Sequence, residues 1–271
     1  MTISPPLFNF ETVEQTGSTN SDLLGRPFQR TPQAPIVLMA YHQTAGRGRR
    51  GRAWHSSQVD RPAGSLTFSL AMERHADARE PLTALSLVVG LCIMNALRTV
   101  YPLEAAALKV KWPNDLVVVG PDASLAKVGG ILIETKRVAQ VQRIVSGVGI
   151  NLFGQTAHIT DHEASYQLHS LLSSAPNASQ LRELARYLGT ELLQTWTQFE
   201  LGGWLAFRDM WTQHDALLGQ QVTIIEADDA QWHGQHLGLD DDGQLRVMTS
   251  TGERRVLVGD VSLRSQTLGG F

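Results

Sequence analysis

The stretch His42–Trp54, HQTAGRGRRGRAW, places the strongest constraint on what this chain can fold into. Its centre, Gly46–Gly51, spells G-x-G-x-x-G, the fingerprint of dinucleotide-binding domains when a strand precedes it and a helix begins at the glycines. An apolar run that predicts a strand does precede it. The residues that follow have no helical period and are interrupted by Pro62 and Gly64, and the region about 20 positions on has no acidic residue before Glu73. The stretch therefore does not predict a dinucleotide-binding domain.

The same stretch has the residue types of an anion-binding loop. Glycine lets backbone N–H groups approach a ligand closely, and arginine gives forked donors for phosphate or carboxylate oxygens. Because like charges repel, we expect a loop that is mobile when empty and becomes ordered over its ligand; an exposed flexible loop is the alternative. Trp54 either closes over a flat organic group or anchors the loop in the core. The arginines are Arg47, Arg49, Arg50 and Arg52.

The composition is typical of a soluble globular protein: 271 residues, 42% of them hydrophobic, with a formal charge of −3. A dedicated nucleic-acid-binding domain is expected to be basic, so the charge disfavours that class. The single cysteine, Cys92, excludes an internal disulfide and favours a reducing compartment. It lies in the run Leu85–Tyr101, which Ser86, Gly90 and Asn95 interrupt and which predicts a buried core helix rather than a membrane span. The N-terminus has no signal-peptide pattern, and we expect a cytoplasmic protein.

The hydrophobic patterns predict an α+β protein with two domains. Residues 1–217 are expected to form a mixed β-sheet domain with packed helices, and residues 218–271 a small antiparallel β-barrel. Hairpin turn sequences, DDDG and STGE, separate the short strands of the second domain. The predicted helices cover residues 17–24, 82–100 and 179–214, and the predicted strands cover residues 34–44, 65–72, 108–112, 115–120, 127–135, 141–152, 220–227, 231–240, 244–250 and 253–264.

Three further segments place polar groups beside glycines or a proline turn. KWPND puts Lys111, Asn114 and Asp115 at a strand end, where a cation suits phosphate and the oxygens suit Mg²⁺; a polar β-turn is the alternative. Lys127 stands two residues before a Gly-Gly pair that opens an apolar strand, where it either reaches a pocket or is solvated. GVGIN ends a strand with small residues beside Asn151. Each segment alone is a weak signal.

Taken together and in order, the motifs resemble those of biotin protein ligases. The matching pieces are GSTN (17–20), HQTAGRGRRGRAW (42–54), KWPNDL (111–116), KVGGILIE (127–134) and GVGIN (147–151). The resemblance implies a catalytic domain like those of class II synthetases and biotin–lipoate ligases, followed by the family's small SH3-like domain. Only 16 residues precede GSTN, so we expect a form without the DNA-binding domain and repressor function of some family members.

The resemblance also implies an activity. The family makes biotinyl-5′-AMP from biotin and ATP with Mg²⁺, and passes the biotinyl group to a lysine of a biotin carboxyl carrier domain in acetyl-CoA carboxylase or another biotin-dependent carboxylase. We expect neither nucleic-acid nor membrane binding. Sheet-edge dimerisation occurs in the family, so a homodimer is one possible oligomeric state of this protein.

The resemblance further implies roles for individual residues. The catalytic residues would be Lys127, Arg49 and Asp115, with the choice between general base and orienting group left open for Asp115. Asn114 would be a Mg²⁺ ligand. Biotin would contact Ser18, Thr19, Asn20, Gln43, Arg47, Gly48, Arg49, Lys127 and Gly129. ATP or the adenylate would contact Arg47, Arg49, Arg50, Arg52, Trp54, Lys111, Asn114 and Asn151.

Three other functions compete with this interpretation. A lipoate or octanoate ligase or transferase has a related fold and handles another acyl chain. A nucleic-acid-binding or regulatory protein could use the arginine loop, and would bind DNA in a salt-sensitive way. His158 and His162 have the spacing of a metal hydrolase but lack the glutamate of H-E-x-x-H.

Overall fold

The computed structural model describes residues 8–54, 64–78, 80–120, 124–154, 158–161, 164–226, 230–257 and 262–265. The chain divides into two compact units. The first comprises residues 1–80, 129–155 and 170–194, and the second comprises residues 81–128, 156–169 and 195–271. Each unit is described by itself.

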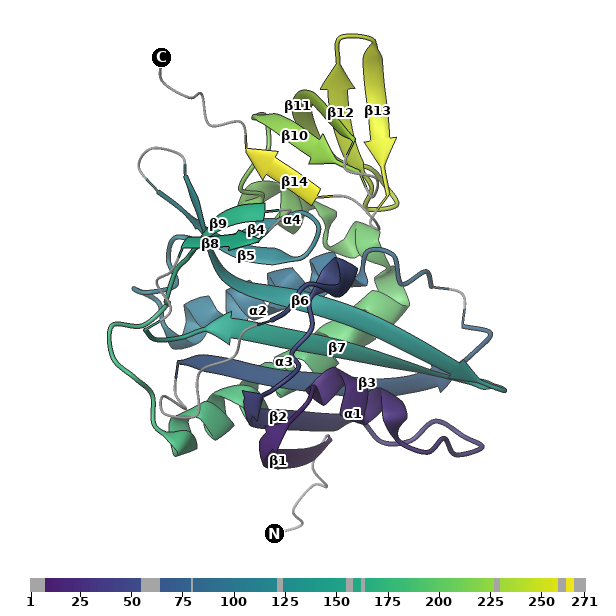
Figure 1. Ribbon diagram of the computed structural model, residues 1–271. Helices are drawn as coiled ribbons and strands as arrows, with labels where there is room; N and C mark the ends of the chain where they lie inside the picture. Colours follow the sequence, from purple (N-terminus) through teal and green to yellow (C-terminus); the bar gives the residue numbers. More distant parts are fainter. Residues whose placement is uncertain are drawn as a thin grey trace. The chain divides into compact units, whose positions relative to one another are not determined.

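The first unit is built on five neighbouring strands in the order β1-β2-β3-β7-β6 (Figure 1). The pairing of β1 with β2 is parallel, and the other pairings are antiparallel, which makes the mixed sheet that the sequence predicts. The bounds are β1 Asn9–Thr16, β2 Ile36–Gln43, β3 Ser65–His75, β7 Val141–Asn151 and β6 Leu125–Val138, of which residues 129–138 belong to this unit.

A short helix, α1 (Thr19–Gly25), covers one face of this sheet. Its Leu23 is fully buried in a cluster with Leu38, Ala71 and Val145 from three strands. The opposite face is covered by the first part of α3 (Ala178–Gly202), where Gly189 lies against the Val37 side chain. Successive residues of a strand point to opposite faces, and the consecutive apolar residues 37–40 of β2 are all buried, so both helices pack on a hydrophobic surface.

The second unit contains the apolar helix α2 (Leu85–Val100), and twelve of its 16 residues are buried. It packs against β4 (Leu108–Lys111), β5 (Asp115–Val119) and α4 (Arg208–His214). The run around Cys92 is therefore a core helix, as predicted. Within the part of the chain that the structure describes, no helix is long and apolar enough to cross a membrane.

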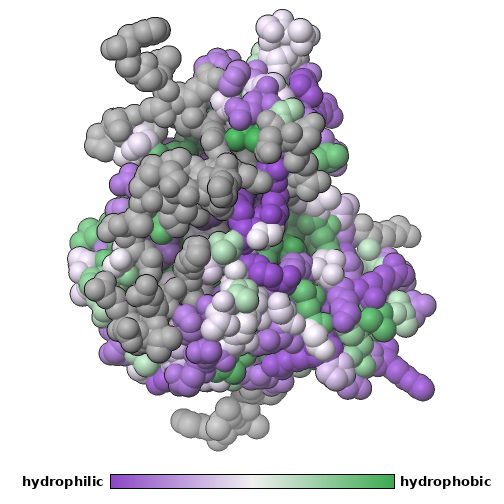
Figure 2. Space-filling model, in the orientation of Figure 1, coloured by the Kyte–Doolittle hydropathy of each residue, from purple (hydrophilic) through white to green (hydrophobic). Residues whose placement is uncertain are grey.

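On the face drawn in Figure 2, apolar side chains are interspersed with hydrophilic ones.

The second unit also contains an antiparallel sheet in the order β13-β12-β11-β10-β14. This confirms the small β domain, although no ladder among the described residues joins β13 to β14 to close a barrel. The strand predicted over residues 253–264 is wrong, because its two ends pair with different neighbours: β13 with β12, and β14 with β10. The bounds are β10 Gln221–Ile225, β11 Gln231–Leu239, β12 Leu245–Thr249, β13 Gly252–Val256 and β14 Ser262–Ser265. The domain division at residues 217 and 218 stays a prediction.

A buried carboxylate ties this sheet to β4 inside the second unit. Asp215 Oδ2 accepts hydrogen bonds from His236 Nε2 at 2.7 Å and from Trp211 Nε1 at 3.2 Å. The next residue, Ala216, donates its backbone N–H to the Val110 carbonyl at 2.8 Å. Since buried polar groups need partners, this arrangement fixes the chain where the last sheet begins.

Other elements differ from the sequence prediction. The helical run over residues 179–214 is interrupted after α3, because Gly203 has a φ of +60° and a short 3-10 turn, Trp204–Ala206, separates α3 from α4. Strand β1 was not predicted, nor were β8 (His158–Asp161) and β9 (Ala164–Leu168).

A pair of glycines tests the packing of the second unit. Gly243 and Gly219 have nearly equal φ values, +77° and +78°, but an added Cβ at Gly243 would lie 2.9 Å from Ala84 Cβ, whereas Gly219 faces open space. We expect Gly219→Ala to lower the free energy of unfolding by about 1 kcal/mol through backbone strain. Gly243→Ala should cost at least about 1 kcal/mol more through the added clash. Urea unfolding measures both, and equal losses would contradict the packing.

Candidate ligand-binding site

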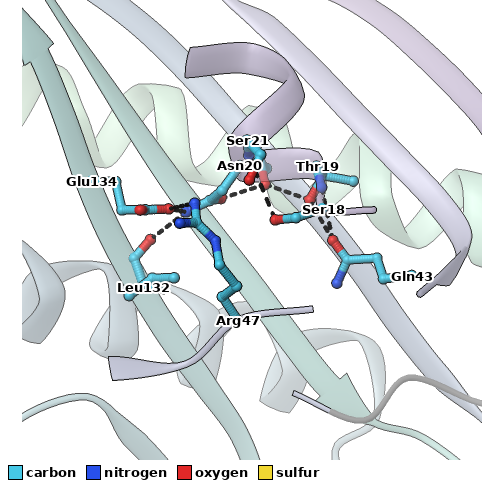
Figure 3. A network of polar contacts seen from close by, with 9 residues as sticks. Ser18, Thr19, Asn20, Ser21, Gln43, Arg47, Leu132 and Glu134 are labelled. Carbon is cyan, nitrogen blue, oxygen red and sulfur yellow. Dashed lines mark hydrogen bonds and ion pairs between the residues drawn. The ribbon is translucent and has the colours of Figure 1, made fainter. Parts of the chain in front are cut away.

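The N-terminus of α1 carries the predicted motif GSTN and faces the end of β2. Ser18 is the N-cap, and its side chain accepts the Ser21 backbone N–H at 3.5 Å. Gln43 Oε1 accepts the Thr19 backbone N–H at 2.8 Å, so β2 satisfies a second donor of the first turn (Figure 3). Ser18, Thr19 and Asn20 are all nearly fully buried. The structure thus brings together four of the residues predicted to bind biotin.

Hydrogen bonds link the hydroxyl and amide groups of this network to one another. Asn20 Nδ2 donates to Leu132 O at 3.2 Å and to Glu134 Oε2 at 2.9 Å, which turns its Oδ1 toward Ser69. The Ser69 hydroxyl donates to that oxygen at 2.6 Å. Thr19 Oγ1 lies 2.6 Å from Ser69 Oγ and 3.1 Å from Gln43 Oε1, so its single proton is shared between these two acceptors. The Thr19 and Asn20 side chains are therefore held in fixed orientations before any ligand binds.

Sequence reasoning missed two members of this network, Ser69 and Glu134. Ser69 is fully buried on β3, and Glu134 lies on β6 with a quarter of its side chain exposed. Both stand in strands that were predicted correctly. The missing signal is the strand register, which pairs Ser69 with Gly147, and Gly147 with Leu132, on the face under α1.

The two glycines of GVGIN make room for side chains on this face. A Cβ at Gly147 would overlap the Asn20 amide, and a Cβ at Gly149 would overlap the indole of Trp54. The glycines are therefore needed for close approach rather than for an unusual backbone conformation. Trp54 is brought against the sheet rather than away from it.

The glycine–arginine stretch forms a narrow hairpin, defined here as residues 46–54. Gly48 N donates to Arg52 O at 2.7 Å, and Trp54 N donates to Gly46 O at 2.9 Å. A single 3-10 turn, Arg49–Gly51, stands at its tip, so the α-helix of a dinucleotide-binding fingerprint does not begin at these glycines. Residues 55–63, which follow, lie outside the described residues. Ordering of this loop over a ligand stays a prediction.

The C-terminal end of α1 is held by a buried guanidinium. Arg143, on β7, donates to the carbonyls of Leu23 at 2.9 Å, Arg26 at 2.7 Å and Pro27 at 3.0 Å. It also pairs with Glu73 on β3, with Nε 2.9 Å from Oε1. Positive charge at a helix C-terminus is favourable, and the carboxylate keeps the buried charge paired.

The predicted lysines meet around one carboxylate in the second unit. Asp115 Oδ1 lies 2.6 Å from Lys127 Nζ, and Asp115 Oδ2 lies 3.3 Å from Lys111 Nζ. Lys111 and Asp115 face each other across the β4–β5 hairpin. Burial alone raises the pKa of Asp115, but the two ammonium groups outweigh it and hold the pKa well below its usual value. Asp115 is therefore ionised at neutral pH.

The remaining predicted residues lie in both units. Gly48, Gly129 and Asn151 belong to the first unit with the hairpin, and Asn114 belongs to the second. Strand β6 carries Lys127 in the second unit and Gly129 in the first, only two residues apart along the chain.

The structure gives the metal predictions little support. No group of three or more His, Cys, Asp or Glu among the described residues could hold a metal ion. Both oxygens of Asp115 already contact lysines, and Asn114 as a Mg²⁺ ligand stays a prediction. His162, part of the metal-hydrolase alternative, lies outside the described residues.

Comparison with known families and structures gives a consistent result. The biotin/lipoate A/B protein ligase family matches residues 12–151, and the biotin protein ligase C terminal domain matches residues 217–264. The biotin–[acetyl-CoA-carboxylase] ligase of Paracoccus denitrificans is 29% identical over 250 residues, covering 92% of this chain and 98% of the relative. The bifunctional ligase/repressor BirA of Escherichia coli is 30% identical over 249 residues, covering 92% of this chain and 72% of the relative.

A solved structure supports the fold. The biotin protein ligase from Aquifex aeolicus in complex with biotin and ATP superposes with a TM-score of 0.74 at 24% sequence identity. The superposition covers 95% of this chain and 99% of the other. The α+β fold with a C-terminal β domain, expected from the sequence, is confirmed.

Gly147→Ala tests the fit of Asn20 against β7. The new Cβ would overlap the Asn20 amide, so we expect a loss of about 1–3 kcal/mol in the free energy of unfolding. Gly17→Ala, just before α1, is the control, because an added Cβ there meets nothing within 4 Å. Chemical denaturation compares the two, and a Gly147→Ala protein as stable as Gly17→Ala would show that Asn20 does not pack as described.

Proposed function

The chain belongs to the biotin/lipoate A/B protein ligase family, and we propose that it activates biotin as biotinyl-5′-AMP and transfers the biotinyl group to a lysine of a biotin carboxyl carrier domain. The observation that carries this proposal is the ordered network of Ser18, Thr19, Asn20 and Gln43 at the start of α1. The match of residues 217–264 to the biotin protein ligase C terminal domain supports biotin rather than another acyl group.

The network has hydrogen-bonding groups that suit a ureido ring. A ureido ring presents two N–H donors and one carbonyl acceptor. The Thr19 hydroxyl, whose proton is engaged by Ser69 and Gln43, keeps acceptor lone pairs, and the Ser18 hydroxyl, which accepts from Ser21, keeps its proton as a donor. A lipoyl or octanoyl chain has no ureido groups, and would leave the remaining donor and acceptor positions of these groups unused in a desolvated site. The network therefore favours biotin over the lipoate and octanoate alternative.

The first step joins two anions. An oxygen of the biotin carboxylate attacks the α-phosphorus of ATP, the bond from that phosphorus to the bridging oxygen breaks, and pyrophosphate leaves. Cations must oppose the charge that builds on the phosphate oxygens, and Arg49 and Lys127 are the proposed residues, with Arg50, Arg52 and Lys111 beside the phosphates. Mg²⁺, bound mainly by phosphate oxygens with Asn114 as the protein ligand, would supply further charge neutralisation.

The second step transfers the biotinyl group. The neutral amine of the carrier lysine attacks the acyl carbon of the mixed anhydride, AMP leaves with the bridging oxygen, and the amine loses a proton. We assign Asp115 an orienting role, because an ionised carboxylate with a lowered pKa and two bound ammonium groups is a weak base. Its carboxylate fixes the positions of Lys111 and Lys127.

The proposal includes a cytoplasmic location, no repressor activity and no nucleic-acid partner. The formal charge of −3 supports the last two, because DNA binding is driven by clustered positive charge. The single cysteine suits a reducing compartment. A homodimer formed through a sheet edge stays open.

Mass spectrometry tests the proposal directly. The protein is incubated with ATP, Mg²⁺, a carrier domain and either biotin, lipoate or octanoate. We expect a gain of one biotinyl group on the carrier, and none when its acceptor lysine is replaced by arginine. Transfer of lipoate or octanoate in place of biotin would establish the alternative function.

Lys127→Ala should reduce biotin-dependent ATP–pyrophosphate exchange by at least about 100-fold, because it removes a cation from the charge that develops at the α-phosphate. Lys136→Ala is the matched control. It replaces an exposed lysine of the same strand, whose ammonium lies over Phe28. Exchange at the wild-type rate in Lys127→Ala would refute its assignment, whatever the control shows.

The pKa of Asp115 makes a prediction for the pH dependence of transfer. A carboxylate with a lowered pKa is ionised well below neutral pH, and its stabilising effect is lost only on acidification below the ordinary value of about 3.9. The rate of transfer from preformed biotinyl-AMP should therefore rise from pH 5 to 9 only through deprotonation of the carrier lysine. Asp115→Asn should lower the rate without changing the shape of this profile. An inflection present in the wild type and lost in Asp115→Asn would identify Asp115 as a general base.

A further inference from the structure

We propose that Glu134 is a positioning residue that holds the hairpin of residues 46–54 against α1, through Arg47, for the biotinyl-adenylate site. This inference rests on the proposed function for the identity of the ligand. It concerns a residue outside the motif positions to which the sequence assigned roles. Its effect is exerted through Arg47 and Asn20 rather than by contact with the reacting atoms.

One oxygen of Glu134 serves two elements at once. Oε2 accepts from Arg47 Nη2 at 2.8 Å and from Asn20 Nδ2 at 2.9 Å. Figure 3 shows the Arg47 side chain extending from the hairpin to this oxygen, with Asn20 approaching it from α1. The carboxylate therefore joins the hairpin to the helix start that carries Ser18 and Thr19. Because Asn20 also donates to the Leu132 carbonyl, this junction is fixed to β6.

The ion pair changes what Arg47 can contribute to an anionic ligand. Its charge is balanced by Glu134 across a contact in which the two side chains are 44% and 24% exposed. Only Nη2 is engaged in this contact, and a guanidinium has five N–H donors, so directed hydrogen bonds to a ligand remain available. Arg47 thus anchors the hairpin through an ion pair that offsets its own charge.

The hairpin has a second, uncharged contact with the same unit. Trp54 lies against Gly149 of β7, at the opposite end of the hairpin from its tip. Without Glu134 the hairpin keeps this contact and its backbone connection to β2, but it loses the bond that orients Arg47. We therefore expect looser retention of the adenylate rather than loss of folding.

The test measures how long the enzyme retains biotinyl-AMP. Glu134→Gln keeps a carbonyl acceptor for Asn20 and removes the charge that binds Arg47. We expect about tenfold faster release of biotinyl-AMP, equivalent to about 1.4 kcal/mol. Unchanged or slower release would overturn the proposal, since slower release would mean that Glu134 competes with the ligand for Arg47.

A double-mutant cycle separates anchoring from direct binding. Arg47→Gln and Glu134→Gln are compared with the double variant, and two residues that act as one unit should give a double variant no worse than the more damaging single one. Losses that multiply would show that the residues act independently and would overturn the proposal. Glu253→Gln is the control, because the Arg246–Glu253 pair has similar exposure, 37% and 31%, in the C-terminal sheet. It should leave release unchanged.

A ligand-free measurement keeps this inference separate from the proposed function. Trypsin cleaves after arginine, so faster cleavage within residues 46–54 reports loss of the anchor even in a protein that makes no adenylate. We expect Glu134→Gln to be cut faster there than the wild type and Glu253→Gln to be cut at the wild-type rate. Equal cleavage in all three would overturn the anchoring role. A wild type without biotin-dependent exchange would instead overturn the proposed function alone.

Discussion

The arrangement of the first unit depends on the buried Arg143 guanidinium under the end of α1. A helix of seven residues is not stable alone in water, so tertiary contacts must hold it. Arg143 provides them by binding three carbonyls at the helix end while Glu73 neutralises its charge. At the other end, Gln43 and Ser69 bind Thr19. Both ends of α1 are thus attached to the sheet, which is why the polar side chains at its start can have fixed orientations.

In each unit, a carboxylate contacts a cation that is predicted to bind the ligand. A site for an anion must hold positive groups together before the anion arrives, and without counterions these groups repel. In the second unit, Asp115 separates and orients Lys111 and Lys127. In the first unit, Glu134 orients Arg47. Each carboxylate fixes the position of a cation and offsets part of its positive charge.

The sequence predicted what depends on local patterns. It predicted the core helix α2, most strands, the C-terminal β domain and the polar cap of α1, because each leaves a period or a capping residue in the chain. It failed for β1, whose sequence NFETVEQT lacks an apolar alternation, and at Gly203, where one residue of positive φ ends a run with helical spacing. Ser69 and Glu134 could not be found, because they meet Asn20 from 49 and 114 positions away and only the strand register brings them together.

That register also bears on how one fold can serve different acyl groups. On the face under α1, the sheet presents the Ser69 hydroxyl and the backbone of Gly147, and α1 adds the Asn20 amide and the Thr19 hydroxyl. At the proposed site, a hydrocarbon chain would gain nothing from these polar side chains, which are bonded to one another. An exchange of specificity there would require replacing the polar groups on the helix and on the strand together. Changing Thr19 alone would leave Ser69 and Asn20 still bonded to each other and still polar.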